Sequence, residues 1–140
     1  MVEHKTCLNV AVKMRNKLDE AVNGRKEGFR KFNRDLAGLC AISSMALKKK
    51  LAKIGIKSKL FLGEFGDEGS HCWIVFGGKA YDLTATQFRK VKSKVLVTPV
   101  SSPRYSKVYK KGKEVKSFLT FKDWPIHQKP YRKLTDYLAA

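Results

Sequence analysis

Three residues of the chain carry the side chains that a thiol-dependent acyl transfer needs: Cys40, His71 and Asp82. A cysteine thiolate is the nucleophile in such a reaction, and an imidazole moves the protons. A carboxylate that accepts a hydrogen bond from one imidazole nitrogen fixes the tautomer and leaves the other nitrogen facing the nucleophile. Each residue alone also fits a structural reading, since a buried cysteine is usually a small hydrophobic side chain. The hypothesis of a triad therefore depends on whether the fold brings the three together.

The Gly77-Gly78 pair predicts where His71 and Asp82 lie relative to each other. Two runs with strand-like alternation flank the pair, and this pattern is a strong signal for a two-residue hairpin turn, because such turns need positive φ angles. Counting outward places Trp73 opposite Asp82 and puts both on the face that carries His71. His71 and Asp82 are then diagonal neighbours with Cβ atoms about 7 Å or less apart. A three-residue turn would place them on opposite faces.

Cys40 begins the clearest helix of the sequence, which we expect to run to about Ile54. Residues spaced four, three, four and three apart define one face of it: Cys40, Ser44, Leu47, Leu51 and Ile54. Gly55 is a typical stop signal. A thiol at a helix N-terminus beside an imidazolium has a lowered pKa, and the backbone N–H there can donate to an oxyanion. This helix start is the only local feature that favours a reactive Cys40.

The other segments predict an α+β fold in which N-terminal helices pack on an antiparallel sheet. Helical spacing covers residues 5–22 and 26–33, and a terminal helix is expected over 131–139. Strand-like alternation covers 59–62, 71–76, 79–84 and 94–98, and residues 105–121 resemble a further hairpin. Since the chain shows no internal repeat or linker, we expect residues 1–140 to form a single domain.

The charge of the chain bounds its partners. Lys and Arg number 30 against 12 Asp and Glu, a formal net charge of +18, which attracts nucleic acid, anionic membranes or acidic proteins. No stretch approaches the roughly 20 apolar residues of a membrane span, and an N-terminus with scattered charges argues against a signal peptide. Cys7, Cys40 and Cys72 are odd in number and irregularly spaced, which favours a reducing, cytoplasmic compartment over a disulfide framework. Without a CxxC pair we expect no metal site, and nothing predicts a cofactor.

Four short motifs surround the three candidate residues: Gly38-Leu39-Cys40-Ala41, Gly55-Ile56-Lys57-Ser58-Lys59, His71-Cys72-Trp73-Ile74-Val75 and Tyr81-Asp82-Leu83-Thr84-Ala85-Thr86-Gln87-Phe88. Their order and spacing resemble the core of the transglutaminase-like branch of the papain-like superfamily, over a little over a third of the chain. Two positions depart from that pattern, Ala41 where the family usually has a bulky residue and Leu83 where many members have proline. The sequence shows no evident equivalent of the papain-type oxyanion glutamine upstream of Cys40, and Asn33 is the nearest amide side chain.

The resemblance implies a papain-like fold and acyl transfer through a thioester at Cys40, with His71 and Asp82 completing the triad. Peptidases, glutamine deamidases, transglutaminases and acyltransferases share this apparatus. We favour a cysteine-dependent amide hydrolase or acyltransferase that acts on a protein, at a peptide bond or a glutamine side chain. The basic charge favours an acidic protein substrate, and Trp73, on the face of the triad, is expected to line the substrate cleft.

The alternative is a basic nucleic-acid-binding protein on the same scaffold. Aromatic and basic residues interleave from Arg104 to Lys133, a pattern that binds single-stranded nucleic acid but also fits the two faces of ordinary strands. The acidic loop 63–70 precedes His71 and has two readings as well, a substrate-positioning loop or a solvated one. The sequence leaves the oligomeric state open.

Overall fold

The computed structural model describes residues 2–32, 39–88, 91–115 and 129–140. These residues form the helices α1 (Val2–Asn23), α2 (Cys40–Lys53), α3 (Pro103–Val108) and α4 (Lys129–Ala139), with a 3-10 turn, η1, at Ala85–Gln87. The strands are β1 (Lys59–Phe65), β2 (Ser70–Phe76), β3 (Lys79–Asp82), β4 (Leu96–Pro99) and β5 (Tyr109–Val115). The α+β class predicted from the sequence is confirmed.

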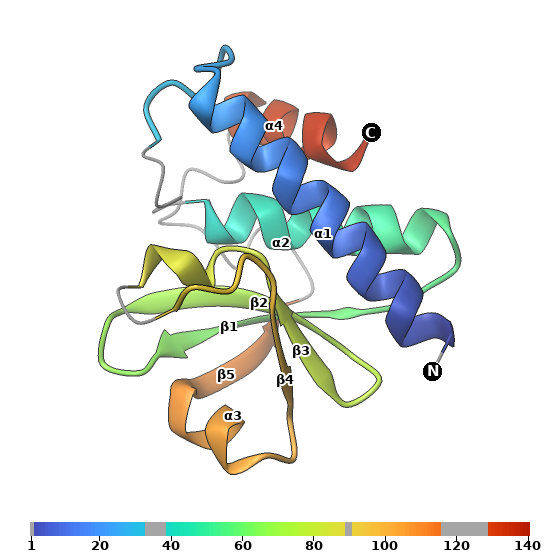
Figure 1. Ribbon diagram of the computed structural model, residues 1–140, viewed down its shortest axis with the longest axis vertical. Helices are drawn as coiled ribbons and strands as arrows, with labels where there is room; N and C mark the ends of the chain where they lie inside the picture. Colours follow the sequence, from blue (N-terminus) through green and yellow to red (C-terminus); the bar gives the residue numbers. More distant parts are fainter. Residues whose placement is uncertain (1, 33–38, 89–90, 116–128) are drawn as a thin grey trace.

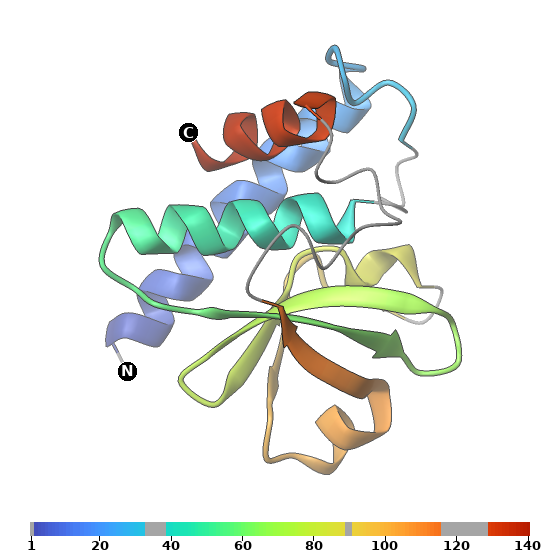
Figure 2. The ribbon, with the colours of Figure 1, turned by 180° about the vertical axis from the view of Figure 1, so that it is seen from behind.

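The described strands form one antiparallel sheet in the order β4-β3-β2-β1-β5. Helices α1, α2 and α4 gather on one side of it, and α3 lies on the opposite side (Figure 1; Figure 2). The short helix α3 contacts both β4 and β5, the two edge strands. The sheet therefore has one face covered by α1, α2 and α4, and a second face on the side of α3.

The β2–β3 hairpin has the two-residue turn that the sequence predicts. Phe76 pairs with Lys79, and Gly77 and Gly78 adopt φ angles of 55° and 79°. Positive φ at both central residues is the geometry that favours Gly-Gly in a tight hairpin. The register of β2 against β3 is consequently fixed at the end of the hairpin remote from His71.

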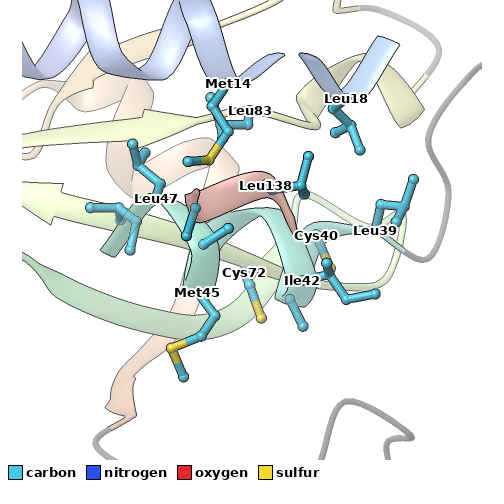
Figure 3. Close-up of a cluster of buried hydrophobic side chains, with 14 of the residues drawn as sticks. Met14, Leu18, Leu39, Cys40, Ile42, Met45, Leu47, Cys72, Leu83 and Leu138 are labelled. Carbon is cyan, nitrogen blue, oxygen red and sulfur yellow. The ribbon is translucent and has the colours of Figure 1, made fainter. Parts of the chain in front are cut away.

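Two clusters of buried side chains occupy the two faces of the sheet. The larger cluster joins the helices to the helix-covered face of the sheet and includes Met14, Leu18, Leu47 and Leu138 (Figure 3). Ile74 and Tyr81 of the sheet belong to the same cluster. The smaller one is rich in aromatic residues and includes Phe65, Trp73, Phe88 and Tyr109, with Tyr105 packed against it. Because neighbouring strand residues point to opposite faces, β2 contributes Cys72 to the first cluster and Trp73 to the second.

Several predicted elements differ from the structure. The helix expected over 26–33 is absent from the described residues 26–32, which form turns, because Gly28 adopts a φ of 87° that a helix cannot accommodate. The hairpin expected over 105–121 is instead α3 followed by the single strand β5 in the described part, since Ser102 accepts a hydrogen bond from the backbone N–H of Tyr105 and caps a helix that begins at Pro103. Ile54 follows α2 and is 51% exposed, so it does not share the buried face of that helix.

The carbonyl end of α4 is held by lysines from two other helices. Lys17 Nζ donates to the Tyr137 carbonyl at 2.6 Å, and Lys50 and Lys53 donate to the carbonyls of Ala140 and Ala139 at 3.0 and 3.1 Å. Cations stabilise helix C-termini because unpaired carbonyls there carry partial negative charge. Part of the basic charge thus serves the fold. None of the described helices is long and apolar enough to cross a membrane.

Candidate active site

His71 and Asp82 form a buried hydrogen-bonded pair between β2 and β3. Nε2 of His71 lies 2.7 Å from Oδ2 of Asp82, and both side chains are fully buried. The two-residue turn brings them to the same face, as the count along the hairpin predicts. Nε2 is thereby engaged by the carboxylate, so that Nδ1 remains for another partner.

Asp82 receives two further hydrogen bonds that the sequence did not indicate. The backbone N–H of Thr84 donates to Oδ1 at 3.1 Å, and the hydroxyl of Tyr109, on β5, donates to Oδ2 at 2.9 Å. Burial and the negative charge of Asp82 raise the pKa of Tyr109, so this hydroxyl stays protonated and remains a donor. A buried carboxylate is costly unless its oxygens are satisfied, and here both oxygens have donors.

Aromatic rings enclose the imidazole of His71. Phe88 and Phe65 meet its ring edge-on with centroids 4.9 and 5.4 Å away, and Trp73 stacks at 6.3 Å. These contacts restrict the rotation of the imidazole, while the hydrogen bond to Asp82 sets which nitrogen faces the carboxylate. The sequence did not indicate that Phe65 and Phe88 contact His71, because these contacts depend on the curvature of the folded sheet.

Trp73 is fully buried behind His71. Its indole N–H donates to the hydroxyl of Tyr105 at 3.2 Å, and its ring occupies space left by Gly63 and Gly112, where an added Cβ would lie 2.7 and 2.8 Å from ring atoms. In this structure Trp73 supports the imidazole and presents no surface to a substrate. The predicted contact with substrate is therefore not seen in this placement.

Cys40 is the first residue of α2 and is only 5% exposed. Its thiol lies beside the side chains of His71 and Cys72, and both neighbours lower its pKa. Nδ1 of His71 has no hydrogen-bond partner among the described residues, so this nitrogen is available to the thiol. Leu39 occupies the N-cap and provides no side-chain hydrogen bond to the first-turn amides beside Cys40. The structure thus brings all three predicted residues together.

The surroundings favour a thiolate–imidazolium pair. The hydrogen bond with Cys72 lowers the pKa of Cys40 most; burial opposes this, and the hydrogen bond and positive charge of His71 lower the pKa further. Burial lowers the pKa of His71, but the charge and hydrogen bond of Asp82, with those of Cys40, outweigh it and raise this pKa to about 9. At neutral pH these effects favour the proton on the imidazole and the negative charge on the sulfur.

Cys72 has a second role besides packing. It is fully buried in the helix-side core, and its thiol lies beside that of Cys40. The hydrogen bond with Cys40, burial and the nearby negative charges of Cys40 and Asp82 all raise the pKa of Cys72. Cys72 therefore remains a neutral thiol and donates to the Cys40 thiolate. His71 and Cys72 are consecutive in β2 and point to opposite faces of the strand, and both influence the Cys40 thiol.

Arg15 fixes the segment that follows Asp82. This buried arginine of α1 donates through Nη1 to the carbonyls of Leu83 and Lys94, both at 2.9 Å, and to Oγ1 of Thr86 at 3.0 Å. Its Nε forms an ion pair with Asp19 at 2.9 Å. The spacing of Arg15 and Asp19, four residues apart on a predicted helix, was the only sequence signal for this anchor.

Two of the three acids in the segment 63–70 before His71 pair with lysines of β5. Glu64 lies 3.2 Å from Lys111, and Asp67 lies 3.4 Å from Lys110. These exposed ion pairs favour the interpretation of this segment as a solvated loop.

Asn33 and the aromatic residues of the segment 116–128 lie outside the described residues. In the part of the chain that the structure describes, no three His, Cys, Asp or Glu side chains cluster in a way that could hold a metal ion.

Comparison with known proteins finds no match for this chain among protein-family models, curated proteins or solved structures. The fold and the geometry of the site therefore carry the functional interpretation.

Proposed function

We propose that the chain is a cysteine-dependent amide hydrolase or acyltransferase of papain-like, transglutaminase-like type, with Cys40 as nucleophile, His71 as acid and base, and Asp82 as the residue that orients the imidazole. The observation that carries this proposal is the Cys40 thiol, which contacts the side chain of His71 while Nε2 of that imidazole binds Asp82. The motifs from Gly38 to Phe88 that resemble the transglutaminase-like core support it independently.

In the first step the Cys40 thiolate attacks the carbonyl carbon of an amide. The backbone N–H of Cys40, in the first turn of α2, donates to the oxyanion that forms. The imidazolium of His71 then transfers its proton to the departing nitrogen, and an amine or ammonia leaves. A thioester on Cys40 remains, and neutral His71 takes a proton from the water or amine that resolves it.

The raised pKa of His71 suits this cycle. A proton held on Nδ1 at neutral pH is available to the leaving nitrogen, which cannot depart as an anion. Asp82 stabilises the imidazolium and keeps its ring oriented, and Tyr109 and Thr84 stabilise the carboxylate. We propose a protein as substrate, either at a peptide bond or at a glutamine side chain, with acidic character that complements the charge of +18.

The decisive experiment compares the alkylation of the three cysteines. At about pH 6, iodoacetamide should modify Cys40 at least about tenfold faster than Cys7, because only a thiolate reacts. Burial raises the pKa of the Cys7 thiol to about 11, so Cys7 is protonated at this pH. His71→Ala should abolish the difference. A glutamine- or peptide-like electrophile should label the same sulfur, located by mass mapping of the fragments.

Cys7→Ser is the matched control, since Cys7 is equally buried and takes no part in the triad. It should leave the alkylation of Cys40 unchanged. Equal rates at Cys40 and Cys7 in the folded wild type would rule out an activated nucleophile and with it the proposed enzyme.

A second candidate function, nucleic-acid binding, is favoured by the charge of +18 alone. It predicts tight binding of a single-stranded polynucleotide that weakens linearly on a plot of log affinity against log salt. Cys40→Ala should bind as the wild type does. Loss of binding at physiological salt would leave the charge to an acidic protein partner.

A further inference from the structure

Two thiols meet at the candidate nucleophile. Cys40 in the first turn of α2 and Cys72 in β2 belong to one buried cluster (Figure 3), and each thiol shifts the pKa of the other. All three cysteines are free in this structure. In the acyl-transfer cycle His71 performs both proton transfers, so the sulfur of Cys72 takes no part in making or breaking bonds.

We propose that Cys40 and Cys72 form a reversible disulfide when the protein meets a hydroperoxide, and that this bond switches the active site off. The inference rests on the proposed function only in what it regulates; the disulfide itself follows from the contact between the two thiols. The nucleophile would thereby be stored in a recoverable form.

The chemistry takes two balanced steps. The Cys40 thiolate attacks one oxygen of hydrogen peroxide, the O–O bond breaks, and the products are Cys40 sulfenic acid and hydroxide, which takes a proton to become water. The sulfur of Cys72 then attacks the sulfenic sulfur, an S–S bond forms, and the S–OH oxygen leaves as water with the proton of the Cys72 thiol. Peroxide is reduced to water, and the two thiols are oxidised by two electrons in total.

The negative charge of Cys40, which raises the pKa of Cys72 in the reduced protein, is lost in the first step. The hydrogen bond and negative charge of Cys40 are among the causes that raise the pKa of Cys72. Sulfenic acid at Cys40 is neutral, so that charge is removed and Cys72 becomes easier to deprotonate. The order of reaction is thereby set: Cys40 is oxidised first, and Cys72 resolves it.

Cys7 provides the contrast. It is as buried as Cys72 and belongs to the same cluster, but its partner is the Tyr81 hydroxyl, and burial raises its pKa to about 11. It has neither a thiolate nor a neighbouring thiol among its known contacts. Oxidation should therefore be confined to the Cys40–Cys72 pair.

The test treats the folded, full chain with a small molar excess of hydrogen peroxide and quenches it with a thiol-blocking reagent. Intact mass should fall by two hydrogen atoms, and proteolysis should yield one cross-linked pair of peptides that contain Cys40 and Cys72. Cys7→Ser should behave as the wild type. A dithiol reductant should restore both the mass and the alkylation of Cys40 at about pH 6.

Cys72→Ser separates this inference from the proposed function. It removes the second sulfur, so peroxide should now drive Cys40 to sulfinic and sulfonic acids that a dithiol cannot reverse, whatever the rate at which Cys40 itself is alkylated. Equally irreversible oxidation of the wild type, with no cross-linked peptide, would overturn the disulfide while leaving the nucleophile intact. A disulfide formed without selective alkylation of Cys40 would overturn the enzyme proposal alone.

Discussion

Tyr109 and His71 bind the same oxygen of Asp82. The Tyr109 hydroxyl donates to Oδ2 at 2.9 Å, and Nε2 of His71 lies 2.7 Å from that atom. Tyr109 begins the edge strand β5, two strands away from β2 in the sheet. The curvature of the sheet thus lets three strands meet at one carboxylate, and the orientation of the imidazole depends on an element that local sequence does not connect with it.

Removal of the Tyr109 hydroxyl should destabilise the fold. Tyr109→Phe keeps the ring in the aromatic cluster but deprives a buried carboxylate of one donor, so we expect the free energy of unfolding to fall by about 1.5–3 kcal/mol. Urea denaturation measures the change. Tyr105→Phe is the control, since it removes only a neutral hydrogen bond to Trp73 and should cost about 1 kcal/mol. Equal costs would contradict the proposed importance of the Asp82 contact.

The alkylation rate of Cys40 should follow an unusual pH profile. Because the pKa of Cys40 is lowered, its thiolate is present in mildly acidic solution and is lost only as the pH falls through that lowered value. The pKa of His71 is raised to about 9, so the ion pair persists through neutral pH and the rate should change again only near pH 9. Stopped-flow alkylation of the Cys7→Ser variant measures this profile. A single rise near the pKa of an ordinary thiol would disprove the ion pair.

Asp82→Asn should lower the pKa of His71, so that the imidazole loses its proton at a lower pH. The carboxylate charge and hydrogen bond raise the pKa of His71 against the effect of burial, so their loss should move this pKa well below about 9. The ring C–H resonances of His71 in an NMR titration report the shift. Asp136→Asn, which removes an exposed partner of Lys49, should leave those resonances unaffected.

Arg15 should stabilise the fold through the hydrogen bonds that it donates to main-chain carbonyls. Arg15→Met preserves much of the side-chain volume but leaves the buried carbonyls of Leu83 and Lys94 without their donor, at an expected cost of about 3 kcal/mol. Arg30→Met is matched in type, and this exposed residue should change stability by less than about 0.5 kcal/mol. Comparable thermal midpoints for the two variants would argue against an anchoring role.

Gly63 should not tolerate a side chain. A Cβ there would lie 2.5 Å from the Lys110 carbonyl and 2.7 Å from the Trp73 ring, so Gly63→Ala should cost about 3 kcal/mol. Gly55→Ala faces open space and suffers only the strain of its φ of 85°, about 1 kcal/mol. Denaturant midpoints that rank the two variants in the opposite order would refute the close packing around Trp73.

The sequence was informative where a signal is local. Helical spacing and the Gly55 stop predict α2, and Gly77-Gly78 predicts the hairpin and hence the pairing of His71 with Asp82. These features depend on neighbours within a few residues. The relation of Cys40 to His71 was less accessible, because it depends on how α2 packs against β2, which no short motif encodes.

The surroundings of the site lay beyond sequence reasoning. Tyr109, Phe65 and Phe88 approach the triad only through the curvature of the sheet, and Arg15 approaches it through the packing of α1. The Lys111-Gly112-Lys113 sequence, typical of a turn, predicts a hairpin over residues 105–121. The capping hydroxyl of Ser102 before Pro103 outweighed that pattern for the first turn.

The lysines that bind the carbonyl end of α4 limit how freely the protein can be engineered. Lys17, Lys50 and Lys53 each fasten that helix through a main-chain oxygen. A redesign that lowers the net charge by exchanging surface lysines for glutamates would place repelling carboxylates against those oxygens at these three positions. Variants intended to separate solubility, crystallisation or polyanion binding from folding should therefore spare them and draw on lysines elsewhere.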